Sequence, residues 1–333
     1  MPGSGRGSRA GSPERFRIVS YNVRYFAHAF RGLGSCRTSR HGIAAALAAL
    51  RPAPDVIALQ EVETRSIRSV VGRPPKRPRQ TQLEAFMDAF EEACAAAGRP
   101  SRYEAFYFRA HVYRVFNASI YTTGLAILVD RDRLAVEGGN SGAPEPITHH
   151  HVALLRKGKQ SRICAHLALR TPRGAALHIF NTHLSLPTPF ATEFWTEPDR
   201  MGFGANQVEE ARKLGTFVEA RAGKEPFILC GDFNAPPGSP VYRHLTAEAG
   251  FEGAQERLRQ IDPAKPRGFP TAGFLRFRMH LDHLFSGGGL RWVDVEGTHP
   301  FGKGPFKGLS DHVPLIGRFE VPGPATSARE RGT

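Results

Sequence analysis

Short apolar runs that end in a polar or turn residue recur along this sequence and predict a strand-rich fold. In one example, residues 227–230 form the apolar run Phe-Ile-Leu-Cys, which stops at Gly231. A run of this length, bounded by a turn residue, is typical of a buried strand. The same pattern predicts strands over residues 16–22, 55–61, 102–116, 124–129, 161–170, 176–182, 281–285 and 291–296, and a closing strand that reaches residue 320.

Apolar residues at helical spacing separate several of these strands. Between residues 83 and 90, four large apolar side chains fall on one face of a helix that we predict over residues 81–97. Residues 185–206 and 269–280 show neither the pattern of a strand nor the periodicity of a helix, so they are predicted to be loops. Strands mixed with amphipathic helices predict an α/β (α+β) fold. Further helices are predicted over residues 43–50, 206–222 and 240–249, with Ser239 and Pro240 suited to begin the last.

The chain is organised as one unit. It has 333 residues, of which 41% are hydrophobic, so it can bury a sizeable core. Neither an internal repeat nor a linker divides it, and we expect one domain over residues 15–320 with disordered tails at 1–14 and 321–333. No secretory signal or membrane-length apolar segment is visible, and the four cysteines are scattered. These features favour a reducing, cytoplasmic location.

The charge of the chain points to an anionic partner. The formal net charge is +14 and the isoelectric point is about 10.1. Such a surface attracts nucleic acid, anionic lipid headgroups or phosphorylated small molecules. Residues 65–79 carry six Lys or Arg side chains and no acid, so they could hold a phosphate backbone or form a solvated basic loop. Aromatic residues between 102 and 116 could stack on bases, although a strand with one buried aromatic face is more usual.

Polar side chains that follow apolar strands are candidates for a shared site. Asp232 and Asn234 lie two residues apart, so on an extended chain they would face one spot, whereas an Asx turn is the structural alternative. Glu61 ends another apolar run, and a buried Glu is costly unless it is paired or bound to a cation. His183 ends a third run. The consecutive histidines 149–151 cannot all bind one ion from a strand, so we expect them at the surface.

Six short motifs follow one another in an order that resembles a known superfamily. They are S-Y-N at Asn22, L-Q-E-V at Glu61, N-T-H-L at His183, G-D-F-N at Asp232 and Asn234, L-D-H-L-F at Asp282, and S-D-H-V-P-L at Asp311 and His312. Together they resemble the endonuclease/exonuclease/phosphatase superfamily, which has the deoxyribonuclease I-like fold. The resemblance extends over residues 15–320 and depends on the order of the motifs, because each tetrapeptide alone is weak.

The resemblance implies both an architecture and a cofactor. The expected fold is a four-layer sandwich of two packed mixed β-sheets flanked by helices, with one site where strand ends converge. The expected chemistry is Mg²⁺- or Mn²⁺-dependent hydrolysis of a phosphate ester. On this pattern Glu61 is the principal metal ligand, assisted by Asn22 and Asp311. Hard oxygen ligands of this kind suit Mg²⁺.

The same resemblance assigns the remaining motif residues to catalysis. Asp232 would orient or deprotonate the attacking water, and Asn234 would bind the phosphate or that water. Asp282 would pair with His312, which fixes the tautomer of the imidazole and favours its protonated form. His312 and His183 would then donate hydrogen bonds to the nonbridging phosphate oxygens.

The motifs exclude some classes of substrate but do not identify the substrate. The histidine of N-T-H-L argues against an abasic-site endonuclease, and His280-Leu281-Asp282-His283 departs from the Trp-x-Asp-Arg of inositol phosphatases. We expect a nuclease or nucleotide phosphodiesterase that acts on nucleic acid, without an obligate protein partner. The alternatives are a sphingomyelinase-type lipid phosphodiesterase whose loop 185–206 meets a membrane, and a phosphoinositide or sugar-phosphate phosphatase. An inactive binding module is disfavoured, because every expected polar position is filled.

Overall fold

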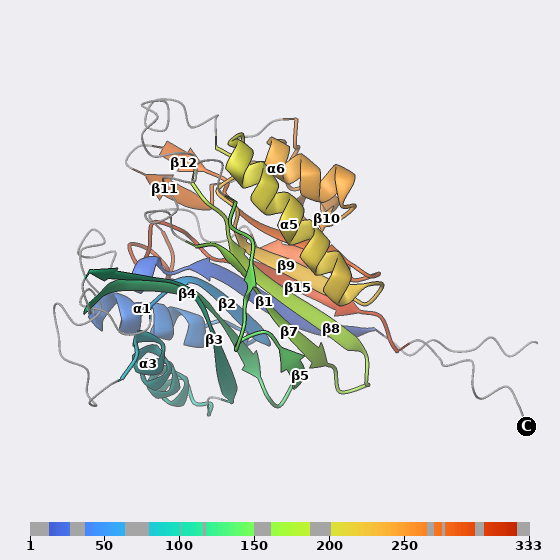
Figure 1. Cartoon of the computed structure of the whole chain (residues 1–333). Helices are drawn as coiled ribbons and strands as arrows, with labels where there is room; N and C mark the ends of the chain where they lie inside the picture. Colours follow the sequence, from blue (N-terminus) through green and yellow to red (C-terminus); the bar gives the residue numbers. More distant parts are fainter. Residues whose placement is uncertain are drawn as a thin grey trace, which may run out of the picture.

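Two β-sheets packed face to face form the centre of the molecule (Figure 1). Each sheet contains both parallel and antiparallel neighbours, so both are mixed, as predicted. The computed structural model describes residues 13–26, 37–63, 80–100, 102–115, 118–149, 161–186, 201–264, 270–274, 277–296 and 303–324.

The first sheet, called sheet 1 below, has the strand order β14-β15-β1-β2-β4-β3. The parallel pair is β1 with β2, which places Ser20 beside Ala58. The central strand β1 is buried over its last seven residues, so the strand predicted over residues 16–22 lies inside the protein. The strands are β1 (Glu14–Asn22), β2 (Val56–Val62), β3 (Tyr103–Val115), β4 (Ala118–Asp130), β14 (Arg291–Glu296) and β15 (Leu315–Val321).

The second sheet, called sheet 2, has the order β10-β13-β9-β8-β7-β5, with β6 beside β7. The hairpin predicted for residues 161–182 is the antiparallel pair β7–β8. The parallel pair is β8 with β9, and β9 is the predicted central strand. The strands are β5 (Ala135–Gly139), β6 (Glu145–Pro146), β7 (Ile163–Arg170), β8 (Ala176–His183), β9 (Phe227–Asp232), β10 (Glu252–Gly253) and β13 (Asp282–Gly287).

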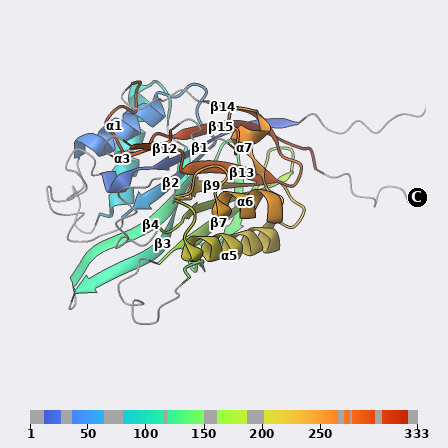
Figure 2. The same cartoon turned by 90° about the horizontal axis from the view of Figure 1, so that it is seen from above.

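Helices cover the outer face of each sheet (Figures 1 and 2). α1 (Arg37–Ala48) and α3 (Gln82–Ala96) lie on sheet 1, and α5 (Ala205–Ala222) and α6 (Pro240–Arg243) lie on sheet 2. The predicted helix 81–97 starts at a capping box, in which Thr81 accepts from the backbone N–H of Glu84 and Glu84 accepts from that of Thr81.

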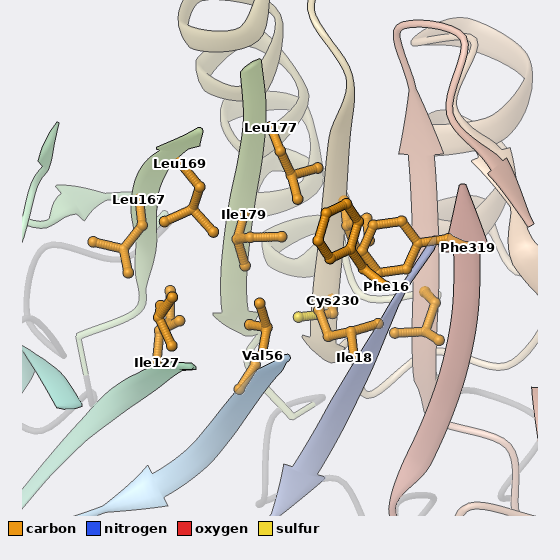
Figure 3. Packing of buried hydrophobic residues seen from close by; sticks show 14 of the residues in the cluster. Phe16, Ile18, Val56, Ile127, Leu167, Leu169, Leu177, Ile179, Cys230 and Phe319 are labelled. Atoms are coloured by element: carbon orange, nitrogen blue, oxygen red, sulfur yellow. The ribbon is translucent and has the colours of Figure 1, made fainter. Parts of the chain in front are cut away.

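Three apolar cores hold these layers together. The core between the sheets includes Ile18 and Val56 from sheet 1 and Ile179 and Cys230 from sheet 2, all fully buried (Figure 3). One further core joins sheet 1 to α1 and α3, and another joins sheet 2 to α5 and α6. Each fully buried large apolar side chain contributes about 1.5–3 kcal/mol. The result is the predicted four-layer sandwich of helix, sheet, sheet and helix.

Two predicted segments differ from the structure. The predicted loop 269–280 contains a hairpin of β11 (Ala272–Phe274) and β12 (Phe277–Met279), so that prediction is wrong. These three-residue strands are too short to show a period, and the contacts that hold them come from residues far along the chain. Gly273 N–H donates to the carbonyl of Asp311 at 2.8 Å, and Ala272 forms a bridge with His312.

The second difference concerns the predicted helix 240–249. It begins at the Ser239 cap as α6, whose Tyr242 N–H donates to Ser239 Oγ at 3.3 Å. It then widens into a π-type turn, His244–Glu248. Among the described residues, no helix combines the length and the apolar run needed to cross a membrane.

Candidate active site

Polar side chains lie at the same level on three neighbouring strands of sheet 2. β8 ends at His183, β9 ends at Asp232, and β13 begins at Asp282. The strand register pairs His183 with Asp232 and Asp232 with Asp282. Residues paired across strands project to the same face of a sheet. Three motifs that are far apart in the sequence therefore meet at one edge of sheet 2.

Sheet 1 contributes two further polar residues opposite this row. β1 ends at Asn22, and β2 carries Glu61 at a bulge between Leu59 and Val62. The φ angle of Glu61 is 56°, a left-handed conformation that costs about 1–3 kcal/mol in a residue with a side chain. The bulge takes Glu61 out of the regular alternation of β2 and brings its carboxylate to Asn22.

The side chain of Asn22 joins the two sheets at the site. Its Nδ2 donates to Glu61 Oε1 at 3.2 Å and to Asp232 Oδ2 at 3.0 Å. The backbone N–H of Arg24 donates to Asn22 Oδ1 at 3.0 Å, and Ser310 Oγ donates to the Asn22 carbonyl at 2.7 Å. These bonds fix the orientation of the amide, so Glu61 and Asp232 are both held by the one amide nitrogen.

Two imidazoles flank the Asp232 carboxylate. The Nε2 atoms of His183 and His312 lie 3.5 Å and 3.6 Å from Asp232 Oδ2. Nδ1 of His312 lies 2.8 Å from Asp282 Oδ2, within hydrogen-bond distance. His183 Nε2 is also 4.0 Å from Glu61 Oε1. The structure thus brings residues from both sheets within reach of a single phosphate group.

Asn234 reaches the site on a turn and not on an extended chain. Its φ angle is 49°, and its backbone N–H donates to Asp232 Oδ1 at 3.0 Å, which is an Asx turn. Its Nδ2 donates to the carbonyl of Leu184 at 2.9 Å. The expectation that Asp232 and Asn234 share a face by strand alternation is therefore wrong, because β9 ends at Asp232. The turn instead fixes the Asp232 carboxylate with a backbone donor.

The charges around Asp232 shift its protonation. Burial raises the pKa of Asp232 to about 7, and Asp282 adds to this, although the His312 imidazole opposes it. Burial disfavours a charged His312, but Asp282, Asp232 and Asp311 outweigh burial and hold the pKa of His312 well above its usual range. Asp232 therefore titrates near neutral pH beside a protonated imidazole, which suits a group that accepts a proton.

The surroundings of Glu61 favour a bound cation. Burial raises the pKa of Glu61, and the negative charge of Asp311 raises it further, while the hydrogen bond from Asn22 opposes both. Arg24 Nη1 lies 2.9 Å from Asp311 Oδ2 and compensates part of this charge. The carboxylates of Glu61 and Asp311 are hard oxygen donors of the kind that Mg²⁺ and Mn²⁺ prefer, whereas Asn22 turns its Nδ2 toward Glu61 and its Oδ1 toward the N–H of Arg24. The residues present fit a divalent cation.

A second group in the site could also be considered for a metal. Ligand atoms of Asp232, Asp282 and His312 lie within 4.8 Å of one another. His312 Nδ1, however, is already bonded to Asp282, and its Nε2 faces Asp232. A protonated imidazole cannot ligate a cation. We therefore interpret this group as an imidazole that is hydrogen-bonded to Asp282 and ion-paired with Asp232, and Glu61 as the centre of the cation site.

Burial also affects the second imidazole. It lowers the pKa of His183 well below the usual value, and the positive charges of Arg162 and His312 lower it further. His183 is therefore neutral at physiological pH. A neutral imidazole still donates one hydrogen bond, so His183 can act as a donor without carrying charge.

Several residues that support the site were not predicted from the sequence. Asn181 Nδ2 in β8 donates to the carbonyls of Leu59 and Ala126 in sheet 1 at 3.0 Å and 3.2 Å, and Gln60 Nε2 donates to Asn181 Oδ1 at 2.8 Å. His283 Nε2 lies 2.7 Å from the carbonyl of Ala235 and so supports the turn at Asn234. The sequence did contain a signal for these supporting residues, because they lie inside the L-Q-E, N-T-H and L-D-H motifs.

Some predicted features lie outside the described residues. These are the basic segment 65–79, residues 187–200 of the predicted loop 185–206, and His150 and His151. His149, the first of the three histidines, is partly exposed.

The comparisons with known proteins agree with this fold. A structure titled as ANGEL2, a 2′,3′-cyclic phosphatase, in complex with adenosine-2′,3′-vanadate is 15% identical, with a TM-score of 0.62 over 94% of this chain and 97% of that chain. The human Nocturnin catalytic domain with bound sulfate is 18% identical, with a TM-score of 0.60 over 93% and 97%. The Bacteroides thetaiotaomicron mannosyl-6-phosphatase Bt3783 is 16% identical, with a TM-score of 0.54 over 91% and 99%. No curated protein sequence matches this chain significantly.

The fold and the convergent strand ends define a hydrolase of the phosphoesterase class with the deoxyribonuclease I-like fold. A family model described as the Endonuclease/Exonuclease/phosphatase family matches residues 19–312, which contain all eight predicted site residues. This protein belongs to that family.

Proposed function

We propose that this protein is a Mg²⁺- or Mn²⁺-dependent phosphodiester hydrolase that acts on nucleic acid or nucleotides by in-line attack of water on phosphorus. One observation carries the proposal: the Asp232 carboxylate lies between the imidazoles of His183 and His312, at 3.5 Å and 3.6 Å, next to Asn22 and Glu61. A carboxylate that can take a proton is thereby surrounded by donors that can hold a phosphate.

The cation site belongs to sheet 1 and to the loop before β15. Glu61 would be the principal ligand, with Asn22 and Asp311 assisting. A divalent ion bound there would polarise a phosphate oxygen and offset the negative charge that develops in the transition state.

The roles of the remaining residues follow from their surroundings. Asp232 orients the attacking water and accepts its proton, and Asn22 and the backbone of Asn234 hold the carboxylate in place. Protonated His312, held by Asp282, and neutral His183 donate to nonbridging oxygens of the phosphate. Asn234 completes the pocket as a polar contact for the phosphate or the water. Loss of one such donor typically lowers the rate by about 100- to 1000-fold.

Charge and fold relatives support a nucleotide substrate. A net charge of +14 favours polyanions. The ANGEL2 structure, which shares the fold, holds an adenosine-derived vanadate, so this architecture accommodates a nucleotide.

A second candidate is a lipid phosphodiesterase of the sphingomyelinase type. Leu186 and Phe203 are large apolar side chains with exposed fractions of 43% and 52%, and they lie on either side of residues 187–200. Exposed apolar residues in this position could contact a lipid surface. The mannosyl-6-phosphatase with the same fold makes a sugar-phosphate phosphatase a further substrate class to include in the test.

A substrate panel tests these proposals. Hydrolysis of single- and double-stranded DNA, RNA, sphingomyelin, mannose 6-phosphate and bis-p-nitrophenyl phosphate should be measured with Mg²⁺, with Mn²⁺ and with chelator. We expect metal-dependent cleavage of a nucleic acid and of bis-p-nitrophenyl phosphate. Turnover of sphingomyelin alone would replace the nuclease proposal with the lipid one. The absence of turnover on every ester, with no metal bound, would favour a binding module.

A further inference from the structure

Arg162 is a buried cation whose side chain the proposed mechanism does not use. It lies directly before β7, and only 8% of the residue is exposed. Its backbone is fixed on both sides, because its N–H donates to Thr148 Oγ1 at 2.6 Å and its carbonyl accepts from the N–H of Ile147 at 3.0 Å. The Nε–H of its guanidinium has no hydrogen-bond partner, and no carboxylate in the described part of the chain forms an ion pair with it.

An unpaired buried guanidinium is unfavourable in the absence of a ligand. Taking the charge out of water costs several kcal/mol unless an opposite charge compensates it. Such a side chain is retained when its partner is a bound anion, and the planar fork of Arg matches the oxygens of a phosphate. The environment of Arg162 therefore points to an anionic group that the protein binds.

A recess beside His183 contains this side chain. It is open to solvent and is lined by residues from β3, β4, the start of β7 and the end of β8. The lining includes the polar side chains of Thr123, Ser161, Arg162 and His183. His183 thus faces the Asp232 carboxylate and also borders the recess.

The strand order places the recess next to the cleavage site and not on it. In sheet 2, β8 lies between β9, which carries Asp232, and β7, which Arg162 precedes. In sheet 1, β2, which carries Glu61, lies between β1 and β4, which contributes Thr123. The recess is therefore one strand further along both sheets than the candidate catalytic residues. Arg162 nevertheless acts electrostatically on His183 and Glu61, because its charge lowers the pKa of both.

We propose that Arg162 binds a second phosphate group of the substrate, adjacent to the phosphate ester that is cleaved. The inference rests on the proposed phosphodiesterase function and makes it more specific. The preferred substrate is a nucleotide or oligonucleotide in which a neighbouring phosphate meets Arg162 at the open side of the recess while the scissile phosphate lies at Asp232, His183 and His312. A substrate with one phosphate leaves the guanidinium uncompensated.

Three thymidine dinucleotides test the inference. They are TpT, which has one phosphate, and the forms with an additional terminal phosphate at the 5′ end (pTpT) or the 3′ end (TpTp). We expect the wild-type protein to have a higher kcat/KM for one of the phosphorylated forms than for TpT. Arg162→Gln should lower that ratio by roughly 10- to 100-fold, as is typical for a charge-assisted hydrogen bond. Arg162→Lys, which keeps the charge without the fork, should give an intermediate ratio.

Arg170→Gln is the matched control. Arg170 lies at the other end of β7, its side chain is 45% exposed, and it pairs with Glu137 at the surface. This variant removes the same charge at the far end of β7 and should leave the ratio unchanged. An equal loss on all three dinucleotides in Arg162→Gln would mean that Arg162 contacts the scissile phosphate. Either that result or an unchanged ratio overturns the inference.

A binding measurement separates this inference from the proposed function. If the wild-type protein cleaves no dinucleotide, the phosphodiesterase proposal fails. Calorimetry with thymidine 3′,5′-bisphosphate and thymidine 5′-monophosphate then tests the subsite directly. We expect Arg162→Gln to weaken the binding of the bisphosphate by 10-fold or more, because a charge-assisted hydrogen bond is lost, and to leave the binding of the monophosphate unchanged. If the wild type and Arg162→Gln bind the bisphosphate with the same affinity, and likewise the monophosphate, the inference is overturned.

Thermal unfolding distinguishes a ligand-binding role from a structural one. Because the guanidinium is unpaired, Arg162→Gln should keep or raise the Tm of the ligand-free protein. A lower Tm together with an unchanged dinucleotide ratio would assign Arg162 to the fold and overturn the subsite.

Discussion

At the scale of single residues, Asp232 shows how the surroundings of a carboxylate determine its chemistry. It is 2% exposed and accepts hydrogen bonds from Asn22 and from the backbone of Asn234. Burial raises its pKa to about 7, so the group exchanges a proton at physiological pH, unlike an ordinary surface aspartate. The two flanking imidazoles define where a phosphate would have to lie.

Asp232→Asn should therefore abolish turnover without unfolding the protein. The amide cannot accept a proton from water, and general-base catalysis contributes typically about 100- to 10,000-fold in rate. We expect kcat to fall by at least ~100-fold and Tm to stay the same or rise, since a buried charge is removed. Asp294→Asn, in a surface pair with Arg318 on β14–β15, is the control for the same substitution. A near-normal kcat in Asp232→Asn would remove this residue from the mechanism.

The Asp282–His312 pair permits a test of coupling. The two side chains share a 2.8 Å hydrogen bond, and if Asp282 acts by holding His312, their effects on kcat should not add. We expect Asp282→Asn and His312→Ala each to lower kcat by roughly 100-fold. The double variant should be little slower than His312→Ala. If the fold-reduction of kcat in the double variant equals the product of the two single-variant reductions, the two residues act independently.

At the scale of elements, the inter-sheet hydrogen bonds of Asn181 position β8 against β2 and β4. Asn181 is fully buried and donates to carbonyls of both sheet 1 strands. Asn181→Leu should lower the free energy of unfolding by about 2–4 kcal/mol, because two buried carbonyls and Gln60 lose a partner. Urea denaturation monitored by circular dichroism measures this.

Thr182→Val on the same strand is the matched control for that prediction. Thr182 is also buried, but its hydroxyl donates only to the carbonyl of Ile163 at 3.1 Å. We expect a loss of about 1 kcal/mol. Equal effects of the two variants would contradict a special role of Asn181 between the sheets.

The elements also show what a sequence can and cannot reveal about this site. The strands and the residues that end them were predictable, because apolar runs and the order of six motifs are local patterns. The conformations of Glu61 and Asn234 were not, since both have positive φ angles that depend on a bulge and on a turn. The hairpin β11–β12 was missed for the same reason, because its bonds to Asp311 and His312 join distant segments. Local pattern identified the participants, and tertiary contacts determined their geometry.

At the scale of the whole molecule, buried histidines make the fold sensitive to acid. His166 and His283 are at least 94% buried in the fold, and burial lowers the pKa of each to about 4. In the unfolded chain a histidine has a pKa near 6.5, so below that pH the unfolded state binds protons that the folded state does not. The contribution of these two histidines to the free energy of unfolding is therefore full above about pH 6.5. It falls as the pH decreases toward 4, by about 3 kcal/mol for each histidine.

The measurement is the Tm of the metal-free protein between pH 7.5 and 4.5. Each buried histidine makes the Tm fall more steeply toward acid, whereas Asp232, whose pKa burial raises to about 7, acts in the opposite direction over this range. His166→Gln should flatten this dependence, because it removes a histidine whose pKa burial lowers. The Nε2 of His166 lies 2.8 Å from His178 Nδ1, and Gln can replace part of this contact. The same dependence of Tm on pH in His166→Gln as in the wild type would contradict the prediction.

The path of the chain through the two sheets has one more consequence. Sheet 2 is built from a continuous stretch, residues 135–287, whereas sheet 1 is assembled from the segments before and after it. His183, Asp232 and Asp282 therefore belong to an insert, and Asn22, Glu61 and His312 belong to its host. If the polypeptide is severed at the turns after Asp130 and after Gly287, none of the three pieces contains all of the candidate site residues. Co-expressed pieces would recover turnover only when they reassemble, so this scaffold could serve as a split reporter whose signal depends on docking of the two sheets.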